Sequence, residues 1–171
     1  MMKKVIGFLM LFFTIALMYS FNEPAKEKIN WISMSKLNEL YAQSPKPILI
    51  DVYTTWCGWC KEMDRTTYKN KKLTTYVNEH YYAVKMDAES SAQIVFNKKS
   101  YTTSDLATYL LMGDMSFPTT VFLPTIDAKP APLAGYLNAA DMEAPLKFFG
   151  EGAHQQQTFV EFNKKMKKEW R

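Results

Sequence analysis

The chain has 171 residues, about the length of one domain, so two complete catalytic domains are excluded. Hydrophobic residues make up 47% and charged residues 22%, as in an ordinary globular protein, which excludes disorder over most of the length. The formal net charge of +4 is small and its cations are dispersed, so the composition gives no support for a nucleic-acid partner.

The first 21 residues differ from the rest of the chain. Lys3 and Lys4 precede an uncharged apolar run over residues 5–19, and a positive start before a short apolar run is typical of a signal peptide. The run also reaches the lower length limit of a membrane-spanning helix, and Met18 is a poor match to the small residue expected near a cleavage site. Residues 1–21 are therefore expected to be a signal peptide or an N-terminal membrane anchor.

The folded domain is expected to begin near residue 29, after a polar tether over residues 22–28. A short strand is predicted over residues 29–32. A helix over residues 35–42 follows, with Ser33 or Ser35 available as its N-cap. Prolines beyond residue 44 end this helix.

A central strand is predicted over residues 48–53, because this run is apolar on both faces apart from Asp51. It leads into a helix that starts at a cysteine motif. A second helix is expected over residues 71–78, followed by another strand over residues 81–86.

In the second half of the chain, residues 88–103 are polar and are expected to be irregular. The later elements are a helix over residues 105–111 capped by Thr103 or Ser104, strands over residues 120–123 and 133–136, and a helix over residues 139–149 after an Asn138 cap. This alternation predicts an α/β fold, with a central mixed sheet of about four to five strands flanked by helices.

Residues 151–171 are expected to form a C-terminal amphipathic helix. Its apolar stripe, spaced three, four and four residues apart, consists of Phe159, Phe162, Met166 and Trp170, and the lysines lie largely off this stripe. We expect the helix to pack on the domain. Contact with a membrane surface or with another protein is the alternative.

The chemistry of the chain concentrates at its two cysteines, Cys57 and Cys60. At a helix N-terminus, residues three apart share one face, so the two sulfurs can reach bonding distance. The same position points the Cys57 sulfur at unpaired backbone N–H groups and at the positive end of the helix dipole, which favours the thiolate. Cys57 is expected to attack a partner's disulfide, and Cys60 to release the reduced partner from the resulting mixed disulfide.

Three other interpretations of the cysteine pair stay open at this point. A structural disulfide is one, although closing so short a loop removes little chain entropy. A zinc site is another, although His80 and His154 lie far away in the sequence and there is no second cysteine pair. The third is a domain that keeps the motif and serves only as a binding platform.

Residues 48–61, ILIDVYTTWCGWCK, resemble the active-site strand, turn and helix start of thioredoxins, including an Asp six positions before the first cysteine. Residues 84–87 are similar to that family's third strand with its lysine, and residues 117–122 to its cis-proline loop and following strand. The resemblance covers about residues 29–150 and implies a thioredoxin-like domain with a thioredoxin fold. The Trp-Cys-Gly-Trp-Cys-Lys motif resembles exported thioredoxin-like proteins of bacteria.

The resemblance implies catalytic roles for four residues. Cys57 is the attacking thiol and Cys60 the resolving thiol. Asp51 is a buried carboxylate that takes the proton of Cys60 through water, with Lys85 as its charged neighbour. The alternative is an Asp51 carboxylate satisfied by hydrogen bonds and a Lys85 on the surface.

The resemblance also implies a substrate-binding surface, which consists of Trp56, Gly58, Trp59, Phe117 and Pro118. A cis Pro118 places the Phe117 backbone beside the sulfurs, where it pairs with an extended substrate segment. The tryptophans form an apolar rim for the partner. Pro118 as a simple strand-starting proline, and tryptophans that only pack on the domain, are the alternatives.

Two departures from the thioredoxin pattern bear on the reaction. Trp59 stands where typical thioredoxins have proline, so the redox potential of that family does not carry over. Residues 90–116 form a longer segment than in a minimal thioredoxin, which is expected to cover or reshape the substrate groove. The dipeptide between the cysteines has no histidine, unlike many isomerases and strong oxidants of the superfamily, and this favours a reductase.

The sequence thus predicts an exported, periplasmic disulfide reductase that acts on cysteine pairs of other exported proteins, without a metal or organic cofactor. A reductase in an oxidising compartment must be recharged, so a membrane electron donor is expected. If residues 5–21 are not cleaved, they attach the protein to the membrane. A disulfide oxidase or isomerase, or a redox-inert thioredoxin-like binding module, is the alternative function.

Overall fold

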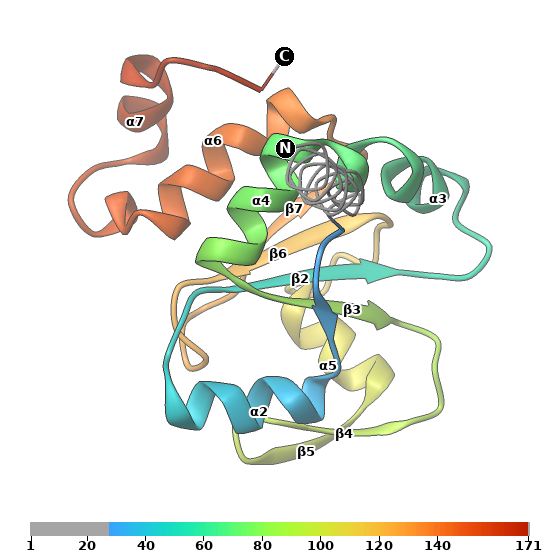
Figure 1. The fold of residues 1–171 in the computed structure, drawn as a ribbon. Helices are drawn as coiled ribbons and strands as arrows, with labels where there is room; N and C mark the ends of the chain where they lie inside the picture. Colours follow the sequence, from blue (N-terminus) through green and yellow to red (C-terminus); the bar gives the residue numbers. More distant parts are fainter. Residues whose placement is uncertain (1–27, 171) are drawn as a thin grey trace, which may run out of the picture.

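A mixed five-stranded sheet lies at the centre of residues 28–170, the part of the chain that this computed structural model describes (Figure 1). In spatial order the strands are β1 (Trp31–Ile32), β3 (Tyr82–Asp87), β2 (Ile48–Tyr53), β6 (Thr119–Leu123) and β7 (Ala131–Ala134). Strands β1, β3 and β2 run parallel, whereas β6 is antiparallel to β2 and β7 is antiparallel to β6. The predicted mixed sheet is therefore confirmed.

Helices cover both faces of this sheet, as predicted. Helices α3 (Gly58–Arg65), α4 (Lys71–His80) and α6 (Ala139–Gly150) lie on one face, and α2 (Met34–Gln43) and α5 (Thr103–Leu110) on the other (Figure 1). Side-chain oxygens cap four of these five helices, namely Ser33 for α2, Asn70 for α4, Thr102 for α5 and Asn138 for α6. The cap of α5 lies one residue earlier than the predicted Thr103, because the Thr102 hydroxyl accepts the N–H of Asp105.

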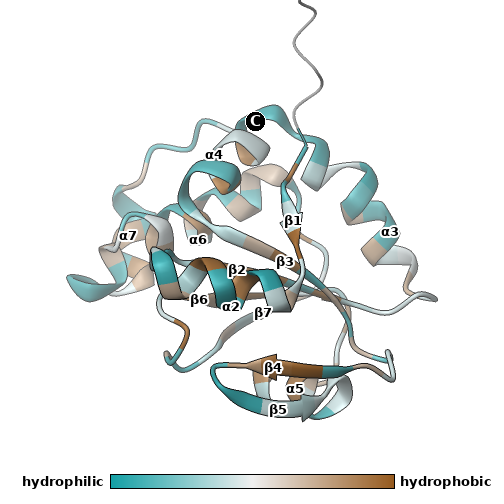
Figure 2. Ribbon diagram, turned by 60° about the horizontal axis from the view of Figure 1, so that its bottom comes forward, coloured by the Kyte–Doolittle hydropathy of each residue, from teal (hydrophilic) through white to brown (hydrophobic). Residues whose placement is uncertain are grey.

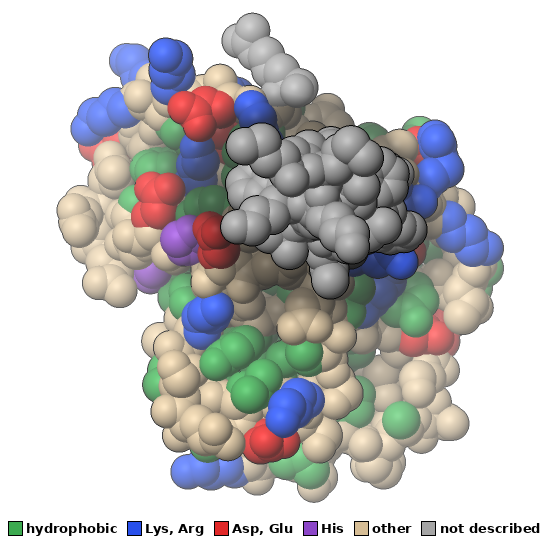
Figure 3. All heavy atoms as spheres, in the orientation of Figure 1, with side chains coloured by type: hydrophobic (Ala, Val, Ile, Leu, Met, Phe, Trp, Pro, Cys, Tyr) green, Lys and Arg blue, Asp and Glu red, His purple; other side chains and the backbone are tan. Residues whose placement is uncertain are grey.

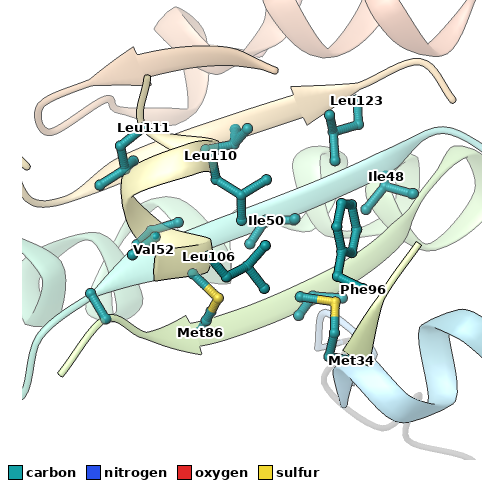
Figure 4. Close-up of a cluster of buried hydrophobic side chains, with 14 of the residues drawn as sticks. Met34, Ile48, Ile50, Val52, Met86, Phe96, Leu106, Leu110, Leu111 and Leu123 are labelled. Carbon is teal, nitrogen blue, oxygen red and sulfur yellow. The ribbon is translucent and has the colours of Figure 1, made fainter. Parts of the chain in front are cut away.

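Strand β2 separates two apolar cores. Its side chains toward α2 and α5 are Ile48, Ile50 and Val52 (Figure 4). Leu49 lies in the other core, together with Met63 of α3. Because side chains alternate along a strand, Asp51 shares the Leu49 face, which α3 covers.

The expectation of irregular structure over residues 88–103 is wrong, because this segment contains a β-hairpin. Strands β4 (Gln93–Phe96) and β5 (Lys99–Thr102) pair antiparallel and lie apart from the central sheet, beside α5 (Figure 2). The turn residues Asn97 and Lys98 both have positive φ, 46° and 63°, as a tight two-residue hairpin requires. The turn has no glycine to signal it. The hairpin packs on α2 and α5 through the buried Phe96.

The prediction of one amphipathic helix over residues 151–171 is wrong. The 3₁₀ turn η2 (Ala153–Gln155) and helix α7 (Phe159–Lys165) are followed by extended backbone at Met166, with φ −70° and ψ 133°. Lysine side chains gather over α7 at the upper left of Figure 3. Trp170 is only 5% exposed, and its ring lies 5.4 Å from that of Tyr76 on α4. The tail therefore packs on the domain in a partly extended form.

A buried carboxylate explains why the helix ends early. Glu143 of α6 is fully buried and accepts the backbone N–H groups of Glu169 and Trp170 at 2.8 and 2.9 Å, as well as Lys147 Nζ at 2.9 Å. Burial alone would raise the pKa of Glu143, but these hydrogen bonds hold it below its ordinary value. In a continuous helix the two N–H groups would pair with carbonyls of the preceding turn, so the bonds to Glu143 require extended backbone.

The Trp170→Ala variant is expected to lower the free energy of unfolding by about 2 kcal/mol, because it empties a buried indole site. The cost stays below that of a central core residue, since the tail can detach without unfolding the sheet. Denaturant unfolding beside the control Val160→Ala, whose side chain is 75% exposed, measures the difference. Equal stability of the two variants would show that docking of the tail contributes nothing.

Residues 1–27, which contain the predicted signal peptide or anchor and nearly all of the tether, lie outside the described residues. Within residues 28–170, no helix is both long and apolar enough to cross a membrane.

Candidate active site

The two cysteines lie where β2 turns into α3. The Cys57 N–H donates to the carbonyl of Thr54 at 3.2 Å, and Cys57 is the N-cap of α3. Its Sγ accepts the backbone N–H of Cys60 at 3.0 Å. Cys57 and Cys60 form a disulfide, and they are 3% and 5% exposed. The sulfur of Cys57 thus occupies the position at which a helix N-terminus stabilises negative charge.

The loop before β6 adjoins this disulfide-bearing turn. Thr119 of β6 pairs with Val52, so Pro118 lies opposite the end of β2. The Phe117–Pro118 peptide bond is cis. The Pro118 carbonyl accepts the N–H of Gly135 at 2.8 Å, which ties the loop to the segment after β7.

Two exposed indoles flank the buried sulfurs. Trp56 and Trp59 are 66% and 63% exposed. The Trp56 ring meets Phe117 edge to face with centroids 6.1 Å apart, and its Nε1 donates to Glu89 Oε2 at 2.9 Å. The Trp59 ring lies 5.4 Å from that of Tyr136. These contacts fix both rings beside the disulfide and leave an apolar surface open to solvent.

Gly58 is the first residue of α3, between the two cysteine-flanking indoles. A Cβ atom at this position would meet no heavy atom within 4 Å. Gly58 is therefore exposed, with open space where a side chain would lie.

Asp51 is buried at 2% exposure beneath this surface. The Tyr68 hydroxyl donates to its Oδ1 at 3.1 Å, and Lys85 Nζ lies 3.7 Å from its Oδ2. Lys85 also forms an ion pair with Asp64 of α3. Burial raises the pKa of Asp51 to about 6, against the opposing effects of the Lys85 charge and the Tyr68 hydrogen bond. Asp51 therefore changes its protonation close to neutral pH.

The sheet register explains why these groups meet. Asp51 of β2 pairs with Lys85 of β3, so their side chains lie next to each other on one face of the sheet. Cys60 and Met63 are three residues apart and share the buried face of α3. Because Met63 packs in the core on the Leu49 face, Cys60 and Asp51 belong to the same side of the sheet.

Four residues of the site were missed by the sequence analysis: Tyr68, Asp64, Glu89 and Tyr136. Asp64 follows Cys60 by four residues on a helix, a spacing that could have indicated a shared face. Tyr68 lies in the 3₁₀ turn η1 (Thr67–Lys69), where no periodic pattern signals the direction of a side chain. Glu89 and Tyr136 come from loops after β3 and β7.

No group of three or more His, Cys, Asp or Glu side chains within residues 28–170 is arranged to hold a metal ion. His80 ends α4 and His154 lies in η2, both outside the cysteine turn. The chemistry that the described site offers is that of its sulfurs and of the carboxylate beneath them.

Comparison with known proteins agrees with this geometry. A segment is 27% identical over 120 residues to the thiol:disulfide interchange protein DsbD of Pectobacterium atrosepticum, and it spans 68% of this chain but only 19% of that relative. A thioredoxin of Borreliella burgdorferi is 31% identical over 107 residues, which are 61% of this chain and 75% of that one.

The fold and the family follow from two further matches. A thioredoxin-fold protein from Helicobacter pylori superposes with a TM-score of 0.59 at 25% identity, over 70% of this chain and 79% of that one. The family model Thioredox_DsbH, described as "Protein of unknown function, DUF255", matches residues 18–171. The chain therefore belongs to the Thioredox_DsbH family and, with it, to the thioredoxin superfamily.

Proposed function

We propose that this protein is an exported thiol-disulfide oxidoreductase that reduces cysteine pairs of other exported proteins. The observation that carries the proposal is the Cys57–Cys60 disulfide at the start of α3, with the Cys57 sulfur accepting a helix N–H. The chain's likeness to a thiol:disulfide interchange protein and to a thioredoxin supports the same reaction class.

The reaction begins from the reduced dithiol. The Cys57 thiolate attacks one sulfur of the partner's disulfide, so that a bond forms between Cys57 and the partner while the partner's own S–S bond breaks and leaves a thiolate. Cys60 then loses its proton and attacks the Cys57 sulfur. The second partner thiolate leaves, and the Cys57–Cys60 disulfide remains. Two electrons have passed from the dithiol to the partner.

Asp51 and Lys85 serve the second half of this reaction. The Asp51 carboxylate accepts the Cys60 proton through water, and a pKa of about 6 leaves it largely ionised at neutral pH yet basic enough to take a proton. Lys85 compensates the negative charge of the ionised carboxylate. The side chains share one face of the sheet beneath α3, which supports this assignment.

Trp56, Trp59, Phe117 and Pro118 bind the partner. The exposed indoles and the ring of Phe117 give an apolar surface around the sulfurs, where large aromatic side chains contribute most to binding. The Phe117 backbone before the cis bond pairs with an extended segment that carries the partner's cysteine. The open space at Gly58, between the two cysteines in the sequence, leaves room for that segment.

The reductive direction rests on the motif and on the N-terminal segment. The dipeptide Gly58-Trp59 has no histidine to stabilise the thiolate further, which disfavours a strong oxidant. The positive, apolar N-terminus supports export of the domain to the periplasm, as a soluble or anchored protein. In that oxidising compartment, a membrane electron donor returns the disulfide to the dithiol.

The reduction potential of the Cys57/Cys60 pair tests the proposal. Equilibration of the full chain in detergent with dithiothreitol or glutathione buffers, followed by a count of free thiols, is expected to give a strongly reducing value, below about −250 mV. A value near −120 mV would instead assign an oxidase, and an intermediate value near −180 mV an isomerase. A pair that never exchanges with these buffers would leave only a binding module.

A further inference from the structure

We propose that Tyr68 is a positioning residue for the resolving step, whose hydroxyl holds the Asp51 carboxylate in the orientation and charge state that accept the Cys60 proton. The inference rests on the proposed oxidoreductase function and assigns a role to a residue outside the cysteine motif. Tyr68 does not contact the reacting sulfurs in this role; it acts through Asp51.

Contacts of both its ring and its backbone hold Tyr68 in place. The residue lies in the short turn between α3 and α4 and is only 5% exposed. Its ring meets Trp31 of β1 edge to face, with centroids 5.1 Å apart. Its carbonyl accepts the hydroxyl of Thr74 on α4 at 3.3 Å. The hydroxyl of this buried ring donates to Asp51 Oδ1 at 3.1 Å.

The two oxygens of Asp51 have different partners. Tyr68 donates to Oδ1, whereas Lys85 lies at 3.7 Å from Oδ2 and is shared with Asp64. The ammonium of Lys85 also lies 5.0 Å from the centre of the Tyr53 ring. Because its charge is divided among these groups, Lys85 alone compensates the buried carboxylate incompletely. The uncharged Tyr68 hydroxyl supplies the shorter contact to the carboxylate, a hydrogen bond to Oδ1.

Tyr68 can donate over the whole range in which Asp51 titrates. Burial, and after it the negative charge of Asp51, raise the pKa of Tyr68 well above its ordinary value, so the phenol keeps its proton at neutral pH. The titratable groups that act on Asp51 are Tyr68 from η1, Lys85 from β3 and Asp64 from α3, and Cys60 of α3 lies on the same side of the sheet. Among them, only Tyr68 is an uncharged donor at pH 5–8 that binds the carboxylate directly.

The Tyr68→Phe variant tests the proposal, because it removes one oxygen atom and keeps the buried ring. Without the hydrogen bond, the ionised form of Asp51 is less stable. The pH midpoint of the Asp51 titration is therefore expected to rise from about 6 by about one pH unit. The resolving step is then expected to be about fivefold slower at pH 6 and almost unchanged at pH 8.5. The first attack by Cys57 keeps its rate.

The two steps are separable in one single-turnover experiment. One equivalent of 5,5′-dithiobis(2-nitrobenzoate) releases a first coloured thiolate when Cys57 attacks and a second when Cys60 resolves. The matched control is Tyr81→Phe, because Tyr81 is equally buried but its hydroxyl donates to the carbonyl of Leu146 at 2.6 Å. Both variants lose a buried hydrogen bond, and only Tyr68→Phe is expected to move the pH midpoint of the second release.

Direct titration of Asp51 by carboxyl ¹³C NMR in the oxidised protein gives a readout that does not need activity. An unchanged midpoint in Tyr68→Phe overturns the proposal, while normal release of both thiolates by the wild type leaves the proposed function intact. If Tyr68→Phe does not fold, site-specific replacement of Tyr68 by difluorotyrosine keeps the shape and strengthens the donor. The midpoint is then expected to fall below that of the wild type, and no change again refutes the role.

Discussion

The Cys57→Ser variant is expected to lose at least about a thousandfold in thiol–disulfide exchange and to keep its fold. A serine hydroxyl is not ionised at the helix N-terminus at neutral pH, and it forms no exchangeable bond to sulfur. The N-cap hydrogen bond to the Cys60 N–H survives, since a serine oxygen caps at least as well as sulfur. The loss therefore reports chemistry and not unfolding.

Exchange with a disulfide-bonded peptide, followed by thiol counting, measures this loss. Cys60→Ser is the matched control, because it still attacks but cannot resolve and is expected to accumulate a mixed disulfide with its partner. Circular dichroism of both variants checks the fold. If Cys57→Ser were as active in cells as the wild type, the surface around Trp56 and Phe117 would serve as a binding module, and the redox proposal would fail.

The parts of this site that were predictable share a short-range signal. Strand β2 was predicted with the observed bounds because six consecutive residues are apolar apart from one carboxylate. That exception, Asp51, was evident for the same reason. The cysteine turn is a local motif, and the alternation of strands and helices predicts a mixed sheet, although not which strands pair with β2.

The parts that were not predictable depend on contacts between distant segments. Tyr68 reaches Asp51 across 17 positions of sequence, and its ring packs against Trp31 while its backbone carbonyl accepts the Thr74 hydroxyl, contacts that no local pattern signals. The early end of α7 has the same origin. The stripe from Phe159 to Trp170 has helical spacing, but hydrogen bonds to Glu143 override it.

Two buried carboxylates differ in how fully their partners compensate the negative charge. Glu143 has two backbone N–H donors and the ammonium of Lys147, and its pKa is lowered although burial opposes this. Asp51 has one hydroxyl donor and a shared lysine, and its pKa is raised to about 6. A carboxylate with full compensation stays ionised and fixes the tail. A carboxylate whose negative charge is only partly compensated gains and loses a proton near neutral pH, as the proposed acid–base role of Asp51 requires.

The Asp51→Asn variant is expected to be more stable than the wild type at high pH and slower in the resolving step. The folded-state pKa of about 6 lies above the ordinary value of 3.8, so the folded state binds the proton more tightly than the unfolded chain. The stabilisation that the protonated Asp51 side chain gives the fold is complete below pH 3.8, and it is lost as the pH rises to about 6. At pH 8, removing the buried charge should raise the free energy of unfolding by up to about 3 kcal/mol. At pH 3.5 the gain should vanish.

Denaturant unfolding of the oxidised wild type and Asp51→Asn at a series of pH values measures this difference, and the subtraction removes the titration of carboxylates common to both. Asparagine keeps an oxygen that can accept the Tyr68 hydroxyl, so the network loses charge and little shape. In the same variant, release of the second thiolate is expected to be about a hundredfold slower at pH 7, since the base is gone. Stabilisation that is independent of pH would show that Asp51 is not titrating in this range. Stabilisation with an unchanged resolving rate would assign the proton of Cys60 to another acceptor, and Asp51 would then be a structural carboxylate only.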